Sequence, residues 1–140
     1  MIYSATKHID GQGRCLGGVV LGSQAFIRGT LEPYLKHTGG ALSPFNAWVM
    51  LKGLETLDLR CRAQADSAHK IAAALEAHPA LNRVLYPGLA SHPQHPLATR
   101  QKEAGGTVIA FDVKGGQAAA FKVLNALQIV LISNNLGDAK

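Results

Sequence analysis

A long helical pattern constrains this sequence more than any other feature. Ser43 can cap a helix with its side-chain oxygen, and Pro44 suits the first helical position, where a missing N–H costs nothing. The pattern runs to about His78, and Pro79 then stops it. Its apolar positions recur every three or four residues, at Leu54, Leu57, Cys61, Ala65, Ala68, Ala72 and Leu75. We expect one long helix with a narrow apolar stripe, whose alanine-rich second half lets a neighbour approach closely.

A helix of this length suggests a boundary between two domains. Helices beyond about 25 residues are unusual in compact domains, and such helices often cross from one domain to the next. Gly53 is a plausible weak point within the pattern. We therefore place the boundary inside the helix, so that the domains are 1–57 and 58–140.

Shorter patterns give the remaining elements. Strands are expected at 2–6, 17–22, 84–86, 107–113 and 129–133, and helices at 24–36, 97–103 and 117–127. A β-α-β-α-β order after a long helix predicts an α/β or α+β class. Trp48, near the start of the long helix, is expected in the core.

The composition suggests a surface that other protein covers. Hydrophobic residues make up 47% of the 140 residues and charged residues 16%, whereas about a quarter charged is usual. The formal net charge of +5 is spread along the chain without a cluster or interleaved aromatic residues, so nucleic acid is not an expected partner.

The cysteines and the apolar runs bear on the compartment. Cys15 and Cys61 form no CxxC pair, and the chain has no signal-peptide pattern, which favours reduced thiols in the cytoplasm. No apolar run approaches the roughly 20 residues that a membrane span needs. His92 and His95 have a spacing that can bind a metal ion, but two prolines in the loop and the lack of an acidic partner favour a surface turn.

Ser4, Thr6 and Lys7 are the candidate chemical residues. Serine and threonine hydroxyls can donate hydrogen bonds to a phosphate, and a lysine amine can condense with an aldehyde. Pyridoxal phosphate (PLP) combines these two groups in one cofactor. The short string alone is common, and a lysine here can equally be a solvated surface residue.

The surrounding motifs carry a family resemblance. The stretch from Tyr3 to Arg14, followed by Gly17–Gly22, resembles the lysine segment of the Cys/Met metabolism (trans-sulfuration) family of PLP enzymes. Four further motifs match that family in the same order: Leu42–Pro44 with Leu51–Leu57, Tyr86–Leu89 with Ser91–Pro93, Gly105–Gly106 with the strand after it, and Leu136–Ala139.

The resemblance implies a fold and roles for single residues. The implied fold is the aspartate-aminotransferase-like PLP transferase fold (fold type I), with 1–57 as the end of the large domain and 58–140 as most of the small domain. Lys7 matches the family's Schiff-base lysine, which also moves protons. Ser4 and Thr6 match its phosphate-binding hydroxyls. Asn135 stands where many relatives have a serine that contacts the substrate carboxylate.

The resemblance also implies a reaction. Gln12–Arg14 and the ending Asn134–Lys140 look most like the O-succinylhomoserine sulfhydrylase branch. That branch makes homocysteine from O-succinylhomoserine and sulfide by γ-replacement, in methionine biosynthesis. The alternatives are an activity of the cystathionine γ-synthase or methionine γ-lyase type, and an inert fragment that does not bind PLP.

Some family features have no counterpart in these 140 residues. His8 stands where relatives usually have tyrosine, and we interpret it as structural. The family's pyridinium-binding acid, ring-stacking tyrosine and phosphate-binding glycines would precede Met1, and its carboxylate-binding arginine would follow Lys140. We therefore expect a carboxy-terminal fragment of a longer enzyme. Its partners would be a small amino-acid substrate and either other copies, commonly in a homotetramer, or a chain that supplies the missing half.

Overall fold

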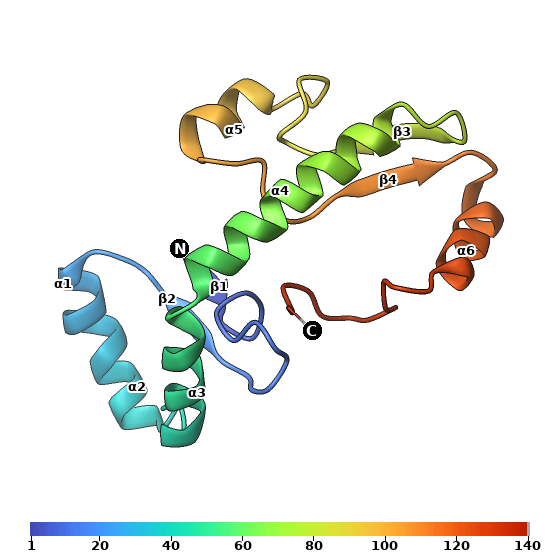
Figure 1. The fold of residues 1–140 in the computed structure, drawn as a ribbon. Helices are drawn as coiled ribbons and strands as arrows, with labels where there is room; N and C mark the ends of the chain where they lie inside the picture. The colour runs from blue at the N-terminus through green and yellow to red at the C-terminus, as the bar shows by residue number, and fades with distance from the viewer. Residues whose placement is uncertain (140) are drawn as a thin grey trace. The chain divides into compact units, whose positions relative to one another are not determined.

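The computed structural model describes residues 1–139 and divides the chain into two compact units (Figure 1). The first unit contains Met1–Asp58, and residues 135–139 also belong to it. The second unit is Leu59–Asn134. These units are defined by contacts, and the division at 57 and 58 into family domains stays a prediction. The return of 135–139 to the first unit was not expected.

In the first unit, β1 (Ile2–Ser4) pairs antiparallel with β2 (Gly18–Val20). Tyr3 lies opposite Val19 in the register, and both are residue types that favour strands. The residues between the strands form a sequence of turns that contains Lys7. The pair therefore fixes both ends of the lysine segment.

The next helical run begins with the side chain of Ser23, which accepts a hydrogen bond from the Phe26 N–H. It consists of α1 (Gln24–Phe26), a π-helical turn η1 (Ile27–Leu31) and α2 (Glu32–Thr38). Pro33 lies at the start of α2, and Gly39 ends it with a positive φ of 76°. The expected helix at 24–36 is confirmed.

The long helical pattern forms two helices, which corrects the expectation of one. They are α3 (Pro44–Leu54) and α4 (Leu57–Glu76), with a turn between them. The Ser43 side chain caps α3 as expected and accepts from the Asn46 N–H. Gly53 serves a close approach, because a Cβ there would lie 2.0 Å from the Ile9 carbonyl oxygen. The interruption itself follows two residues later.

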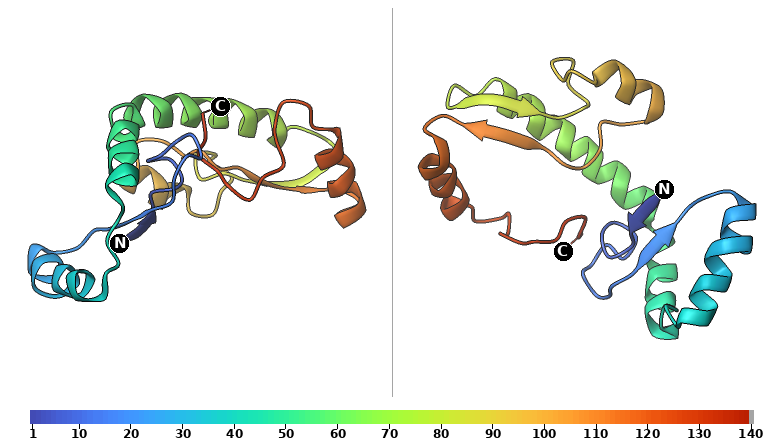
Figure 2. Two further views of the ribbon diagram at one scale, coloured as in Figure 1. Left: turned by 90° about the horizontal axis from the view of Figure 1, so that it is seen from below. Right: turned by 180° about the vertical axis from the view of Figure 1, so that it is seen from behind.

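In the second unit, β3 (Leu81–Leu85) and β4 (Ala110–Val113) form an antiparallel pair with an irregularity between Leu81 and Arg83. The helices α5 (His95–Gln101) and α6 (Gly116–Ala126) complete it. Figure 2 shows α6 following β4 and then a segment without regular structure. The expected strands at 84–86 and 107–113 and both helices are confirmed in outline.

The expected strand at 129–133 is wrong. These residues form neither a strand nor a helix. Ile129 is 93% exposed and Leu131 77% exposed, so the apolar run has no neighbour among the described residues that could bury it. Apolar content without a pairing edge does not make a strand.

Each unit has its own buried cluster. In the first unit it contains Ala5, Cys15, Val49 and Met50. In the second it contains Ala68, Ala72, Val84, Tyr86 and Leu89, which confirms the alanine-rich stripe of α4. Trp48, expected in the core, is 57% exposed and lies beside Phe45 on α3, with ring centroids 6.3 Å apart.

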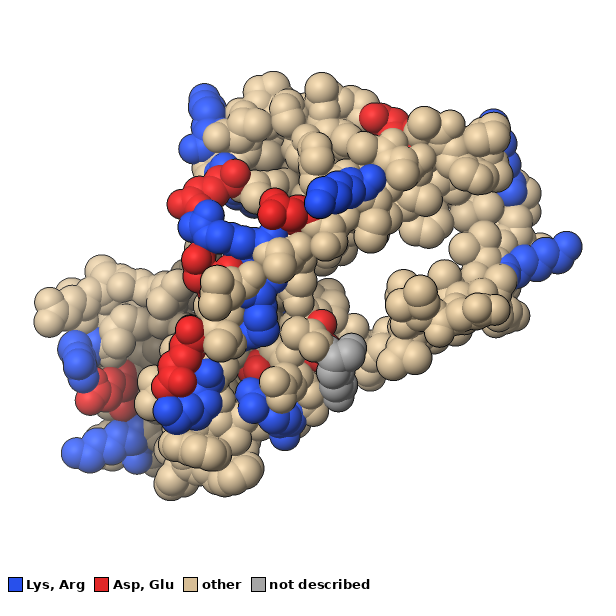
Figure 3. Space-filling model, viewed as in Figure 1, with Lys and Arg blue, Asp and Glu red and all other residues tan. Residues whose placement is uncertain are grey.

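Basic and acidic side chains alternate over the face drawn in Figure 3 rather than gathering in one basic patch. Within residues 1–139, no helix has the length and apolar character that crossing a bilayer requires.

Candidate active site

Lys7 lies in a tight turn that backbone hydrogen bonds fix from both sides. The N–H groups of Ala5 and Thr6 both donate to the Gly17 carbonyl oxygen, at 2.9 and 3.3 Å. The Gly11 N–H then donates to the Lys7 carbonyl oxygen at 2.8 Å. The backbone of Lys7 is therefore held, and the position of its amine depends on its side chain.

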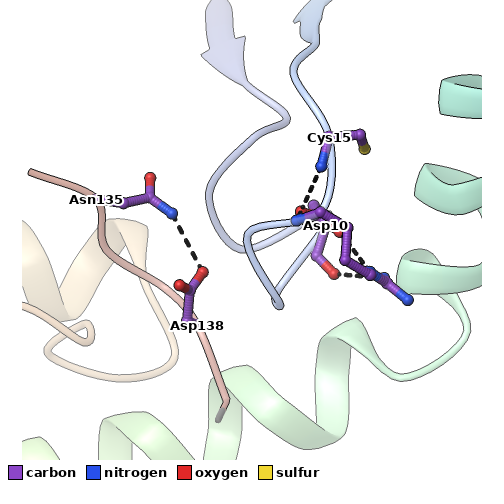
Figure 4. A network of polar contacts seen from close by, with 5 residues as sticks. Asp10, Cys15, Asn135 and Asp138 are labelled. Atoms are coloured by element: carbon purple, nitrogen blue, oxygen red, sulfur yellow. Dashed lines mark hydrogen bonds and ion pairs between the residues drawn. The ribbon is translucent and has the colours of Figure 1, made fainter. Parts of the chain in front are cut away.

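The Lys7 amine contacts a residue that is far away in the sequence. Its Nζ donates to Oδ1 of Asn135 at 2.6 Å, across 128 residues of chain, and the contact is partly buried. The other end of that amide, Nδ2, donates to Oδ1 of Asp138 at 3.2 Å (Figure 4). The structure thus brings together two of the four predicted site residues.

Residues 135–139 dock on the lysine turn at further points. The Ala139 N–H donates to the Gly11 carbonyl oxygen at 2.9 Å. Gly137 has a φ of +86°, and a Cβ there would lie 2.9 Å from the backbone nitrogen of His8, so only glycine fits. The His8 ring is fixed in turn, since its Nδ1 lies 2.8 Å from the Tyr3 hydroxyl. His8 thus contacts both strand β1 and the returning segment.

The two predicted hydroxyls differ in their surroundings. The Thr6 Oγ1 accepts from the Gly17 N–H at 3.1 Å and donates to the Gly17 carbonyl oxygen at 3.4 Å. Ser4 ends β1 and is exposed. The donor contact of Thr6 is long, so its proton can turn toward another acceptor while its lone pair keeps the Gly17 N–H.

Asp10 shapes the loop that follows the lysine. Its side chain is buried and accepts from the Arg14 N–H at 2.5 Å, the Cys15 N–H at 3.2 Å and the Arg14 Nε at 2.9 Å. Burial favours the neutral acid and raises its pKa, but the hydrogen bonds from Arg14 and Cys15 outweigh burial and leave the pKa lowered. Burial also raises the pKa of the Cys15 thiol, and the Asp10 charge adds to that rise.

The second unit contains a cavity of about 380 Å³. Tyr86, Gly88 and α5 contribute to its lining, which mixes acidic with basic side chains, including Asp66 and Lys102. None of the four predicted site residues lines it. His95 of the predicted surface turn also lines it, with Nδ1 2.8 Å from the Pro87 carbonyl oxygen. Nδ1 of His92 accepts from the Gln94 N–H at 3.1 Å.

Comparisons with known proteins define the class. The fold matches a solved cystathionine gamma synthase from Xanthomonas oryzae pv. oryzae, in complex with aminoacrylate and cysteine. The TM-score is 0.94 and the identity 36%, over 99% of this chain and 36% of that one. The expected PLP fold type I is confirmed by this match.

Sequence comparison identifies the family. Residues 1–140 match the family described as Cys/Met metabolism PLP-dependent enzyme, and the chain belongs to it. The chain is 51% identical to the O-succinylhomoserine sulfhydrylases of Mycobacterium tuberculosis and Pseudomonas aeruginosa, in each case over all of this chain. It spans about a third of their length, 36% and 34%.

The residues around Lys7 fit this family's cofactor. A partly buried amine on a fixed turn suits an aldehyde, and the Thr6 hydroxyl retains a proton that can turn to a phosphate oxygen. The roles of Ser4, Thr6, Lys7 and Asn135 toward PLP nevertheless stay predictions.

Sequence reasoning missed Asp10, Tyr3 and Asp138 as parts of the site. Asp10 and Arg14 are opposite charges four residues apart in a glycine-rich stretch, and this pattern is a signal that could have identified the buried pair. Asp138 lies in a quoted motif, but its contact with Asn135 depends on a turn that periodicity does not reveal.

Proposed function

We propose that this chain supplies the cofactor lysine of an enzyme that makes homocysteine from O-succinylhomoserine and sulfide. The observation that carries the proposal is the Lys7 amine, placed on a fixed turn and bound to Asn135 at 2.6 Å. The 51% identity to two O-succinylhomoserine sulfhydrylases supports the substrate. An activity of the cystathionine γ-synthase type is the second candidate, supported by the 36% identity to the solved synthase.

PLP, when bound, supplies a ring that withdraws electrons from the carbon beside the substrate's amine. Lys7 Nζ would hold the cofactor before substrate arrives and afterwards remove and return protons, as a general base and acid within hydrogen-bond reach. Ser4 and Thr6 would donate to the phosphate. Asn135 would contact the substrate carboxylate.

The roles of Asn135 compete for the same amide. An amide NH2 group has two donors, and one of them serves Asp138. Its oxygen serves Lys7. A substrate carboxylate would therefore have to compete for the amide N–H groups beside the carboxylate of Asp138. This makes the substrate role of Asn135 the least supported of the four.

The cofactor attachment is tested on the intact protein, by which we mean the whole translated product of the gene, of which this chain is all or part. The protein is incubated with PLP, reduced with borohydride, digested and mapped by mass spectrometry. We expect the label on Lys7, with loss of label in Lys7→Ala but not in Lys52→Ala. Lys52 is a matched control because it is exposed and its amine pairs with the exposed Glu55 at 2.7 Å. Label elsewhere, or none, would contradict the proposal and favour the inert alternative.

The substrate is tested by supplying O-succinylhomoserine with either sulfide or cysteine. We expect homocysteine from sulfide to form faster than cystathionine from cysteine. The reverse preference would favour the γ-synthase activity while leaving Lys7 as the cofactor residue.

We also propose that the intact protein forms oligomers and acts in the cytoplasm. Large apolar side chains such as Trp48 and Ile129 are exposed, which suits a surface covered by other protein. Cys15 and Cys61 are free thiols, as a reducing compartment permits. Light scattering on the purified protein checks the assembly.

A further inference from the structure

The two ends of the Asn135 amide meet groups of opposite character. Its oxygen accepts from the Lys7 amine at 2.6 Å. Its nitrogen donates to the Asp138 carboxylate at 3.2 Å, as Figure 4 shows. An ammonium group has donors only and a carboxylate has acceptors only. Turning the amide over would place donor against donor at Lys7 and acceptor against acceptor at Asp138. The two contacts therefore select one orientation.

We propose that Asp138 is a positioning residue for Lys7, acting through the orientation of the Asn135 amide. Whenever the amine loses its proton, it becomes an acceptor and can attract the amide NH2 instead of the oxygen. Asp138 keeps the NH2 directed away, so the oxygen stays ready for the returning proton. Each time the Lys7 amine regains its proton, it therefore returns to the same hydrogen bond with the Asn135 oxygen. The effect of Asp138 on the Lys7 amine does not depend on the proposed function. Its importance for catalysis does.

Contacts on either side hold Asp138 where this role requires it. Gly137 packs against His8 with a positive φ, a backbone conformation that glycine adopts readily. The Ala139 N–H donates to the Gly11 carbonyl oxygen. Asp138 lies between these two docked residues, three positions after Asn135. The segment is thus fixed to the same turn that carries Lys7, so a change at Asp138 reaches the amine through a short path.

The test measures the chemical reactivity of Lys7 in the cofactor-free intact protein. Trace acetic anhydride labels lysines in proportion to their unprotonated, accessible fraction, and mass spectrometry reports Lys7 against Lys52. In Asp138→Ala we expect Lys7 to react roughly threefold to tenfold faster at pH 8, because one oriented acceptor to a charged donor is lost. Asp138→Asn keeps the shape, but its amide offers both an acceptor oxygen and donor N–H groups and so selects no orientation; we expect Lys7 to react faster than in the unaltered protein, by less than in Asp138→Ala.

A double-mutant cycle separates orientation from simple charge. If Asp138 acts through the amide, Asp138→Ala should change little in a protein that already carries Asn135→Ala. Unchanged Lys7 reactivity in both Asp138→Ala and Asp138→Asn, or an equal effect of these changes in the Asn135→Ala background, would each overturn the proposal. Faster labelling of all lysines in Asp138→Ala would indicate unfolding, and the near-isosteric Asp138→Asn, alone and combined with Asn135→Ala, then decides. No PLP is present, so failure of cofactor attachment at Lys7 is a separate result.

Discussion

Around Lys7 the first unit is held by hydrogen bonds, whereas around Tyr86 the second unit is held by close packing. Lys7 reaches Asn135 across 128 residues of chain through a single polar contact. Tyr86 is fully buried, and its hydroxyl donates to the carbonyl oxygens of Ala65 at 3.3 Å and Gly106 at 2.9 Å. Polar contacts can exchange for substrate groups, while packed contacts resist change. The region around Lys7 is therefore suited to binding and proton transfer, and the region around Tyr86 to stabilising the fold.

The largest effect should follow from Lys7→Ala. Without the amine, proton transfer and cofactor attachment are both lost, so homocysteine formation by the intact protein should fall by at least about a thousandfold. The urea midpoint should barely change, since the side chain is half-buried and its amine donates to Asn135 at the surface of the turn rather than packing in a core. Lys52→Ala should leave both quantities unchanged. A loss of stability as large as the loss of activity in Lys7→Ala would mean that this region is also structural.

Gly105→Ala should produce the opposite pattern. A Cβ at Gly105 would lie 2.6 Å from the Gly88 Cα and 2.7 Å from the Tyr86 Cζ, so backbone must move. We expect a loss of about 3 kcal/mol in the free energy of unfolding, typical of overpacking a tight site. Gly29→Ala is the matched control, because nothing lies within 4 Å of its Cβ position. Urea titration measures both, and equal stability of the two variants would contradict the packing account.

Asp10→Asn should have a smaller effect that depends on pH. The variant keeps the shape but loses charge-assisted bonds from Arg14 and Cys15, which should cost about 2 kcal/mol near pH 7. Because the folded-state pKa of Asp10 is lowered, its stabilisation is complete above the ordinary carboxyl value of about 3.9. It is lost as the pH falls through the folded-state pKa.

Urea midpoints at several pH values check this expectation. The gap between the unaltered protein and Asp10→Asn should stay constant from pH 6 to pH 8 and shrink below about pH 4. Glu32→Gln, which removes an exposed pair with Arg28, should leave the urea midpoint nearly unchanged at every pH. A stability difference that widened in acid would contradict the lowered folded-state pKa of Asp10.

The packed region was the more predictable of the two from sequence. Spacing by three and four identified Ala65, Ala68 and Ala72 on the buried side of α4, because periodicity reports which face of a helix is apolar. It did not reveal the turn after Leu54, since the apolar spacing continues across Glu55 and Thr56. It also assigned a strand to 129–133, where apolar residues lack a neighbouring edge.

The site region was predictable only in part, and mainly through family motifs. Those motifs marked Lys7 and Asn135, but local spacing alone cannot place two residues in contact across 128 positions. The burial of Asp10 was not foreseen, because a charged residue in a glycine-rich turn is usually exposed. Long-range polar contacts depend on the completed fold, whereas the buried face of a helix follows from the spacing of nearby apolar residues in the sequence.

The smallest effect should come from Tyr86→Phe, which sharpens the distinction between packing and polar contact within the second unit itself. The ring that Gly88 and Gly105 enclose remains, so packing is preserved. Only the hydroxyl proton shared between the Ala65 and Gly106 carbonyl oxygens is lost, which should cost about 1 kcal/mol. Hydrogen exchange should quicken in peptides that cover residues 65 and 106, with the midpoint of urea unfolding only slightly lower. A loss as large as that of Gly105→Ala would mean that hydrogen bonds, rather than packing, hold this region.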